Sequence, residues 1–477
     1  MSEAILSTTA IKPQEQQKDW TPAKVTYTAL MAFNLLSFIW LLATGSGIDN
    51  MPLIIWITRL VAVPFAIHLG RLWKDKGFLI LLTYTSLFFL RVFIPAPGDL
   101  FQEEVAENVL SALWLFTACY GLGRILTTEQ LKHFLFICTI LWTAFMAVLC
   151  SIGIYAVWTE KPVYLLHDAI VYLYEQRLNI IYLATTSGSL TGFTILIGIL
   201  MAVCIKSHFC KTGIVLMLLP VILATALTDS RTAFVSVPAG IAVMFFFGVF
   251  YHVKAKEEPV GRKKNWKPWV FGIITMVFVF VLLVFLFLQI TPVFNRIRMQ
   301  GIIPRAYAEE TVKTSVATRG FTGSRVLTGR AELWEEVIEH IRQNPIILLT
   351  GESKLAPLRK FDNYYAHTHC LYLQVLLESG IPGLLLFLSF ILYTLINAMW
   401  IIRIPETPRW LRLLPALPIS LWVGDIAETF TWLRSSQCPM GAVALISSGI
   451  ICAKAFAFIH ESESRRNEKA ELRSVLS

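Results

Sequence analysis

Two histidines, His367 and His369, stand one residue apart just before an apolar stretch that runs to the break Gly380-Ile-Pro-Gly383. Imidazole titrates near neutral pH, so either histidine could act as a general base on a hydroxyl group. Histidines in this spacing can also ligate a metal, but a site needs a third ligand, and no spacing in the chain nominates one. An ordinary interfacial histidine without chemistry is the third interpretation.

Arg231 lies in the stretch "ALTDSRTAFVSV", between two apolar blocks. A charge at such a place usually faces a cavity or a partner rather than lipid, which makes Arg231 a candidate anion-binding residue. Two structural alternatives stay open. Asp229 could form a local salt bridge with it, or the side chain could snorkel to the lipid head groups.

A second candidate, Arg330, opens the stretch "RAELWEEVIEHIRQNP". Thr328 as N-cap and Asn344-Pro345 as terminator predict a helix between them, with an apolar stripe at Leu333, Trp334, Val337 and Ile341. A cation in the first turn is unfavourable beside the positive end of the helix dipole, and a bound phosphate would offset that cost. A solvated arginine, or a pair with Glu332 or Glu335, is the alternative.

A strongly apolar chain must position these residues. Of its 477 residues 56% are hydrophobic and 15% are charged, whereas soluble domains carry roughly a quarter of charged residues. Continuous apolar blocks recur, each long enough to cross a ~30 Å hydrocarbon core, and continuous blocks favour helices over barrels. We therefore predict an all-α polytopic membrane protein with about twelve spans, at residues 25–44, 51–70, 78–94, 105–123, 134–157, 184–205, 212–228, 233–251, 268–289, 380–402, 413–433 and 437–459.

The distribution of basic residues predicts the orientation. With the N-terminus in the cytoplasm, the inner segments carry 23 of the 41 Lys and Arg residues, whereas the outer segments 45–50 and 95–104 carry none. This alternation follows the positive-inside rule and places both termini inside. It also accounts for the net charge of +9 without a nucleic-acid partner.

The resulting organisation has five parts. They are a cytoplasmic tail over 1–24, nine spans over 25–289, an outer loop over 290–379, three spans over 380–459 and a cytoplasmic tail over 460–477. The aromatic outer segment 158–183 is predicted to be an interfacial helix. On this topology His369 and Arg231 lie at the outer membrane face, and Arg330 lies in the outer loop.

At these residues the sequence resembles the O-antigen ligase and O-antigen polymerase (Wzy-like) superfamily of bacterial membrane glycosyltransferases. The ligase branch carries a histidine, a small polar residue, nine spacer residues and then G-x-x-G, and His369-Cys370, residues 371–379 and Gly380–Gly383 match this spacing. Cys370 stands where Asn, Ser or Gln is usual, and Leu384 where Thr or Val is usual. "DSRTAF" resembles the S-R-x-A segment of the family, and "LTGRAELW" resembles its (S/T)-G-R-x-x-x-W segment. The resemblance covers mainly residues 225–400.

The resemblance implies a GT-C-like fold in the bacterial inner membrane, with the active site facing the periplasm and with neither metal nor cofactor. The donor would be a glycan on undecaprenyl diphosphate, and the acceptor a sugar hydroxyl, which the ligases find on lipid A–core. His369 would be the general base, and Arg231 and Arg330 would bind the diphosphate. Further members of the site would be Arg325, His367 and Arg177.

Two kinds of alternative remain. Within the superfamily, a polymerase or a protein O-oligosaccharyltransferase differs only in its acceptor. Outside it, a secondary transporter also often has twelve spans, and charged residues in or near the spans keep this hypothesis open: Arg59, Arg91, Asp425 and Glu428, the last two predicted to share a helix face. The large asymmetric outer loop argues against paired transporter halves.

Overall fold

The computed structural model describes residues 20–44, 52–93, 109–159, 161–165, 170–174, 177–180, 184–228, 230–256, 266–297, 330–352, 368–404, 407–426 and 439–476. The side chains of Arg91, Arg177, Arg231 and Arg330 lie outside this description, although their backbones are within it. Arg325, His367 and Glu428 lie outside it altogether.

As far as Thr159 the chain is helical in its described part. Its elements are α1 (Pro22–Thr44), α2 (Leu53–Gly70), the short η2 (Leu72–Lys74), α3 (Lys76–Phe93), the π-helical η4 (Trp114–Cys119), α5 (Tyr120–Ile125) and α6 (Thr128–Thr159). A cluster at the predicted inner face ties α3 to α5. There the Asp75 carboxylate accepts hydrogen bonds from Arg124 Nη1 at 2.5 Å and from the Tyr120 hydroxyl at 2.7 Å.

Three strands follow α6 where an interfacial helix was predicted. They are β1 (Val163–Tyr164), β2 (Ile170–Tyr174) and β3 (Arg177–Ile180), and they form an antiparallel sheet in the order β1-β2-β3. The prediction of an interfacial helix for 158–183 was therefore wrong. Aromatic and β-branched residues suit a pleated, half-buried surface, and this sheet buries Val171, Leu178 and Ile180 against the helices.

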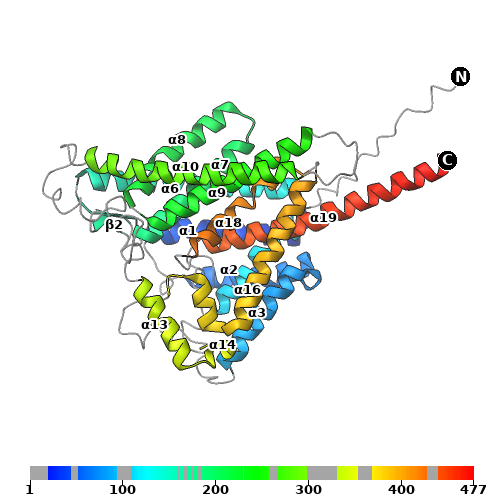
Figure 1. Ribbon diagram of the computed structural model, residues 1–477, viewed down its shortest axis with the longest axis horizontal. Coiled ribbons are helices and arrows are strands. Elements are labelled where there is room, and N and C mark those ends of the chain that lie inside the picture. The colour runs from blue at the N-terminus through cyan, green and yellow to red at the C-terminus, as the bar shows by residue number, and fades with distance from the viewer. Residues whose placement is uncertain are drawn as a thin grey trace.

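After the sheet come the long helices α7 (Ala184–Cys204), α8 (His208–Thr228), α9 (Arg231–Lys256), α10 (Lys267–Ile297), α16 (Leu371–Arg403) and α19 (Pro439–Leu476). Short helices lie between them: α13 (Arg330–Gln343), α14 (Ile347–Thr350), α17 (Arg409–Leu413) and α18 (Ala416–Gly424). Helix α10 lies along α9, while α13 and α14 lie beside α16, on the other side of the molecule from α8 (Figure 1).

Among the described residues, nine helices are long and apolar enough to cross a membrane. They support a helical polytopic membrane protein, whereas the count of twelve spans stays a prediction. The shorter elements occupy three predicted spans. In particular, the described helical residues of the predicted span 413–433 are the last residue of α17 and the whole of α18, which begins after Pro415 and ends at Gly424.

Candidate functional site

His369 lies between a buried threonine and the start of α16, and its backbone is in the left-handed region, with φ of 50°. For a residue with a Cβ atom this conformation costs about 1–2 kcal/mol. Such residues persist where the surroundings over-determine them, and they are found often at functional sites. The side chain of His369 is partly buried.

Thr368 supplies that restraint, because all its polar groups are hydrogen-bonded and it is fully buried. Its backbone N–H donates to Gln374 Oε1 at 3.0 Å, and its hydroxyl donates to the Cys370 carbonyl at 2.8 Å. Its own carbonyl accepts a hydrogen bond from Trp334 Nε1 at 2.8 Å. The residue before His369 is thus held by α13 on one side and by α16 on the other.

Cys370 occupies the N-cap position of α16 and makes no side-chain capping hydrogen bond. This is where the ligase pattern usually has a small polar residue, the type that caps a helix best. Burial raises the pKa of the Cys370 thiol, and the Asp425 carboxylate raises it further, while N–H groups of the first helical turn lower it. The raised pKa keeps the thiol neutral at neutral pH.

The C-terminal end of α18 anchors the start of α16. The Leu371 N–H donates to the Asp425 carbonyl at 2.9 Å, and the Tyr372 hydroxyl donates to the Trp422 carbonyl at 3.0 Å. Asp425 is fully buried and is the C-cap of α18 rather than a residue within a long helix. The predicted helix face shared with Glu428 is not tested, because Glu428 is outside the described residues.

The same short helix contacts the first turns of α9. The Ser420 hydroxyl donates to the Ser236 carbonyl at 2.6 Å. A Cβ atom added at Gly424 would lie 3.3 Å from Ser236 Cβ and 3.5 Å from Thr232 Cγ2, so the two backbones approach closely. Helix α18 therefore links the start of α9 to the start of α16.

Helix α13 begins at Arg330 and ends at Gln343, as the sequence predicts. Its apolar stripe packs on the first half of α16: Leu333, Val337 and Ile341 are buried in one cluster with Ile347 and Leu377. Trp334 belongs to the same stripe, and its ring nitrogen makes the hydrogen bond to Thr368. This double use of Trp334 was not foreseen, since periodicity reports the apolar face of a side chain and not its polar atom.

The predicted break in α16 is at Gly380, whose φ of 63° and ψ of −171° are open essentially to glycine alone. A Cβ there would lie 2.8 Å from the Leu348 carbonyl oxygen. On the other side of this contact the Glu352 N–H donates to the Leu377 carbonyl at 2.6 Å, and the Glu352 carboxylate pairs with His340 Nε2 at 2.6 Å. The break is therefore packed tightly against the end of α14.

The three segments singled out in the sequence are thereby connected. Arg231 is the first residue of α9, Arg330 is the first residue of α13, and His369 stands two residues before α16. Helix N-termini carry partial positive charge and bind anions. The third arginine candidate, Arg177, is the first residue of β3, and strand β3 packs on α6, α7 and α8.

The other charged residues singled out in the sequence have a structural role or lie outside the described residues. Arg59 is fully buried in α2, and its guanidinium lies over the rings of Phe38, Trp56 and Trp114, with the closest centroid at 4.4 Å. Within the described residues no three His, Cys, Asp or Glu side chains are grouped closely enough to hold a metal. Because His367 lies outside these residues, the H-x-H metal hypothesis is not tested.

Comparison with known proteins gives one finding. Residues 214–388 match a protein-family model described as O-antigen ligase. This region contains the stretch around Arg231, helix α13, His369 and the break at Gly380. Comparisons with curated proteins and with solved structures gave no match.

Proposed function

Residues 214–388 of this helical membrane protein carry the O-antigen ligase family sequence, and from this premise we propose that the chain transfers a glycan from undecaprenyl diphosphate to a sugar hydroxyl. The family match indicates a membrane enzyme of the glycosyltransferase kind. To this we add a specific donor, a specific acceptor and the roles of three residues. The acceptor proposed is lipid A–core, and the reaction takes place at the periplasmic face of the bacterial inner membrane.

In the proposed reaction His369 removes the proton from the acceptor hydroxyl as a general base. The acceptor oxygen attacks the anomeric carbon, the bond from this carbon to the diphosphate oxygen breaks, and the configuration inverts. Arg231 and Arg330 neutralise the charge that develops on the departing diphosphate. Guanidinium groups suit this role because they form two parallel hydrogen bonds to phosphate oxygens.

The observation that carries the proposal is the strained backbone of His369 within the matched region. A left-handed histidine, held by the hydrogen bonds of Thr368, is the kind of outlier that a functional constraint maintains. The segment around His369 is hydrogen-bonded to Trp334 on α13, the helix that begins at Arg330. It is also hydrogen-bonded to Asp425 at the end of α18, the helix that contacts the start of α9. These connections support a common site for the three residues.

The test uses purified protein in nanodiscs, with lipid-linked glycan as donor and lipid A–core as acceptor. His369→Ala is expected to abolish transfer, and Arg231→Lys and Arg330→Lys are each expected to lose most of it, because an ammonium cannot fork to two oxygens. Matched controls are His208→Ala, on an exposed histidine, and Arg342→Lys, on an arginine whose side chain is 74% exposed. Full transfer by folded His369→Ala protein would refute the general-base role.

The acceptor separates the alternatives within the superfamily. Extension of the glycan on its own lipid carrier would identify a polymerase, and modification of a protein hydroxyl would identify an O-oligosaccharyltransferase. A transporter would instead move solute across vesicles without any change in the lipid-linked glycan. Arg325, His367 and Arg177 are proposed as supporting residues, and their replacement should reduce transfer less than that of Arg231.

A further inference from the structure

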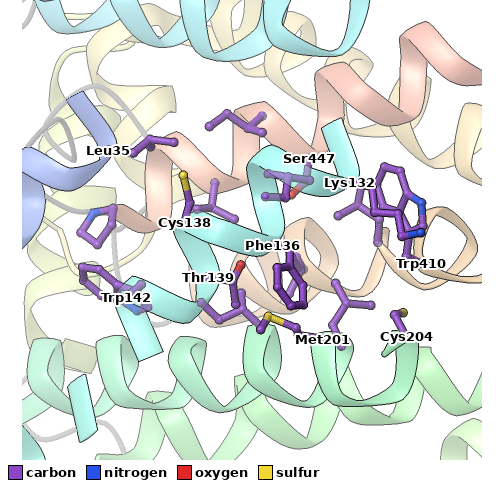
Figure 2. A pocket seen from close by; sticks show the side chains of 18 of the residues that line it. Leu35, Lys132, Phe136, Cys138, Thr139, Trp142, Met201, Cys204, Trp410 and Ser447 are labelled. Atoms are coloured by element: carbon purple, nitrogen blue, oxygen red, sulfur yellow. The ribbon is translucent and has the colours of Figure 1, made fainter. Parts of the chain in front are cut away.

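A second feature of the molecule is an apolar cavity of about 370 Å³ among α1, α6, α7, α17, α18 and α19. This volume is within the ~300–1,000 Å³ that is usual for small-molecule sites. Figure 2 shows Lys132, Trp410 and Cys204 toward one end of the cavity and Leu35 and Trp142 toward the other. The cavity is thus elongated, apolar along its length and charged at one end.

The charges at that end come from three segments that are far apart in the sequence. Lys132 and Lys206 line the cavity directly. Arg409 opens α17 beside Trp410 and, like Lys132, lies close enough to the Cys204 thiol to interact with it electrostatically. Each of the three cations belongs to a predicted cytoplasmic segment, so this end of the cavity faces the cytoplasmic leaflet on the predicted topology.

Within the part of the chain that the structure describes, Lys132 has one ion pair, with Glu129 at 3.7 Å, and both side chains are at least half exposed. Pairs of this kind contribute little, about 0–1 kcal/mol. The ammonium group can therefore exchange this carboxylate for a phosphate oxygen at little cost.

The cavity is deep enough for a lipid chain. Lys132 and Trp142 both line it and are ten residues apart on α6, which corresponds to about 15 Å along the helix. That length is half of the ~30 Å hydrocarbon core of a bilayer. A chain that enters beside Lys132 thus reaches the middle of the membrane.

We propose that this cavity binds an anionic phospholipid of the cytoplasmic leaflet, with one acyl chain between α1, α6, α7 and α19 and its phosphate at Lys132 and Lys206. Basic pockets between transmembrane helices on the cytoplasmic side are a recurrent setting for anionic head groups. Charge complementarity selects this occupant over the polyprenyl chain of a glycan donor, whose diphosphate would lie at the outer face beside His369. The site is independent of the proposed transfer reaction.

The head-group part is tested by native mass spectrometry of the full chain, released from nanodiscs of equal parts phosphatidylglycerol and phosphatidylcholine. Wild-type protein is expected to retain phosphatidylglycerol preferentially. The double variant Lys132→Gln/Lys206→Gln should lose this preference by about thirtyfold, since each lysine near a membrane surface is worth about 1 kcal/mol and about 1.4 kcal/mol is a factor of ten. The control Lys74→Gln/Lys76→Gln makes the same charge change on exposed residues of another predicted inner segment that do not line the cavity.

The acyl-chain part is tested by Thr139→Phe, which fills the cavity without a change of charge, because Thr139 lines it on α6 (Figure 2). Retained lipid should fall for both lipid types in this variant. Equal retention of the two lipids by the wild type, an undiminished preference in the Lys132/Lys206 variant, or an equal loss in the Lys74/Lys76 control would each overturn the head-group site. Undiminished retention by correctly folded Thr139→Phe protein would overturn the placement of the chain.

Discussion

The indole nitrogen of Trp334 donates a hydrogen bond to the carbonyl oxygen of Thr368 at 2.8 Å, across 34 positions of the sequence. It joins the helix that begins at Arg330 to the residue directly before His369. Because Thr368 is fully buried, this hydrogen bond helps to fix the backbone conformation directly before the proposed base.

Trp334→Phe keeps the ring in the apolar stripe and removes only the donor. The Thr368 carbonyl would then be buried without this partner, at an expected loss of about 1–3 kcal/mol of unfolding free energy. We expect a lower transition temperature and a lower transfer rate. Thermal unfolding in detergent and the rate of glycan transfer measure the two effects. Trp158→Phe, at a residue 59% exposed, is the control and should change neither.

Variants at His369 separate its chemistry from its backbone strain. Asparagine tolerates the left-handed region better than most residues, whereas valine does not. His369→Asn should therefore unfold at or above the wild-type temperature while it loses transfer. His369→Val should lose transfer, and its free energy of unfolding should fall by about 1–2 kcal/mol. A stable and fully active His369→Asn protein would contradict the proposed general base.

Cys370 leaves the N-cap of α16 without a side-chain capping bond. Cys370→Ser and Cys370→Asn place a stronger acceptor than a thiol beside the N–H groups of the first turn, and we expect each to stabilise the protein by at most about 0.5–2 kcal/mol. The measurement is thermal unfolding of the two variants beside Cys210→Ser, which changes an exposed thiol within α8. No gain over this control would show that the neutral thiol already satisfies the helix end.

Gly380→Ala places a methyl group 2.8 Å from the Leu348 carbonyl at a φ of 63°. An expected loss of about 1–3 kcal/mol follows, since this region of φ and ψ is essentially restricted to glycine. Gly213→Ala and Gly248→Ala are matched controls, because a Cβ there meets nothing within 4 Å and both positions are helical. They should stabilise the protein by about 0.5–1 kcal/mol.

Local features of the sequence predicted much of this arrangement. The apolar stripe and Asn344-Pro345 delimited α13, and the glycines and Pro382 located the break in α16. The prediction of an interfacial helix over 158–183 was wrong because aromatic and β-branched residues suit both a membrane surface and a strand. Hydropathy does not separate the two.

What the sequence did not predict depends on distant partners. The positive φ of His369 needs Trp334 on α13 and Gln374 on α16, and Leu371 uses a carbonyl that belongs to Asp425. Main-chain acceptors carry no sequence signal, so a pattern cannot reveal them. The predicted helix face shared by Asp425 and Glu428 likewise took no account of the position of Asp425 at the end of α18.

The break at Gly380 also divides α16 into a shorter part before it and a longer part after it. Beyond it the helix continues to Arg403, whose guanidinium lies over the rings of Trp269 and Trp400 at 5.4 and 5.6 Å. A bilayer of different thickness changes the tilt of long helices, so it acts first on this longer part. The shorter part is held by α13 and α18, and α14 packs against the break itself. We therefore expect the alignment at His369 to depend little on bilayer thickness.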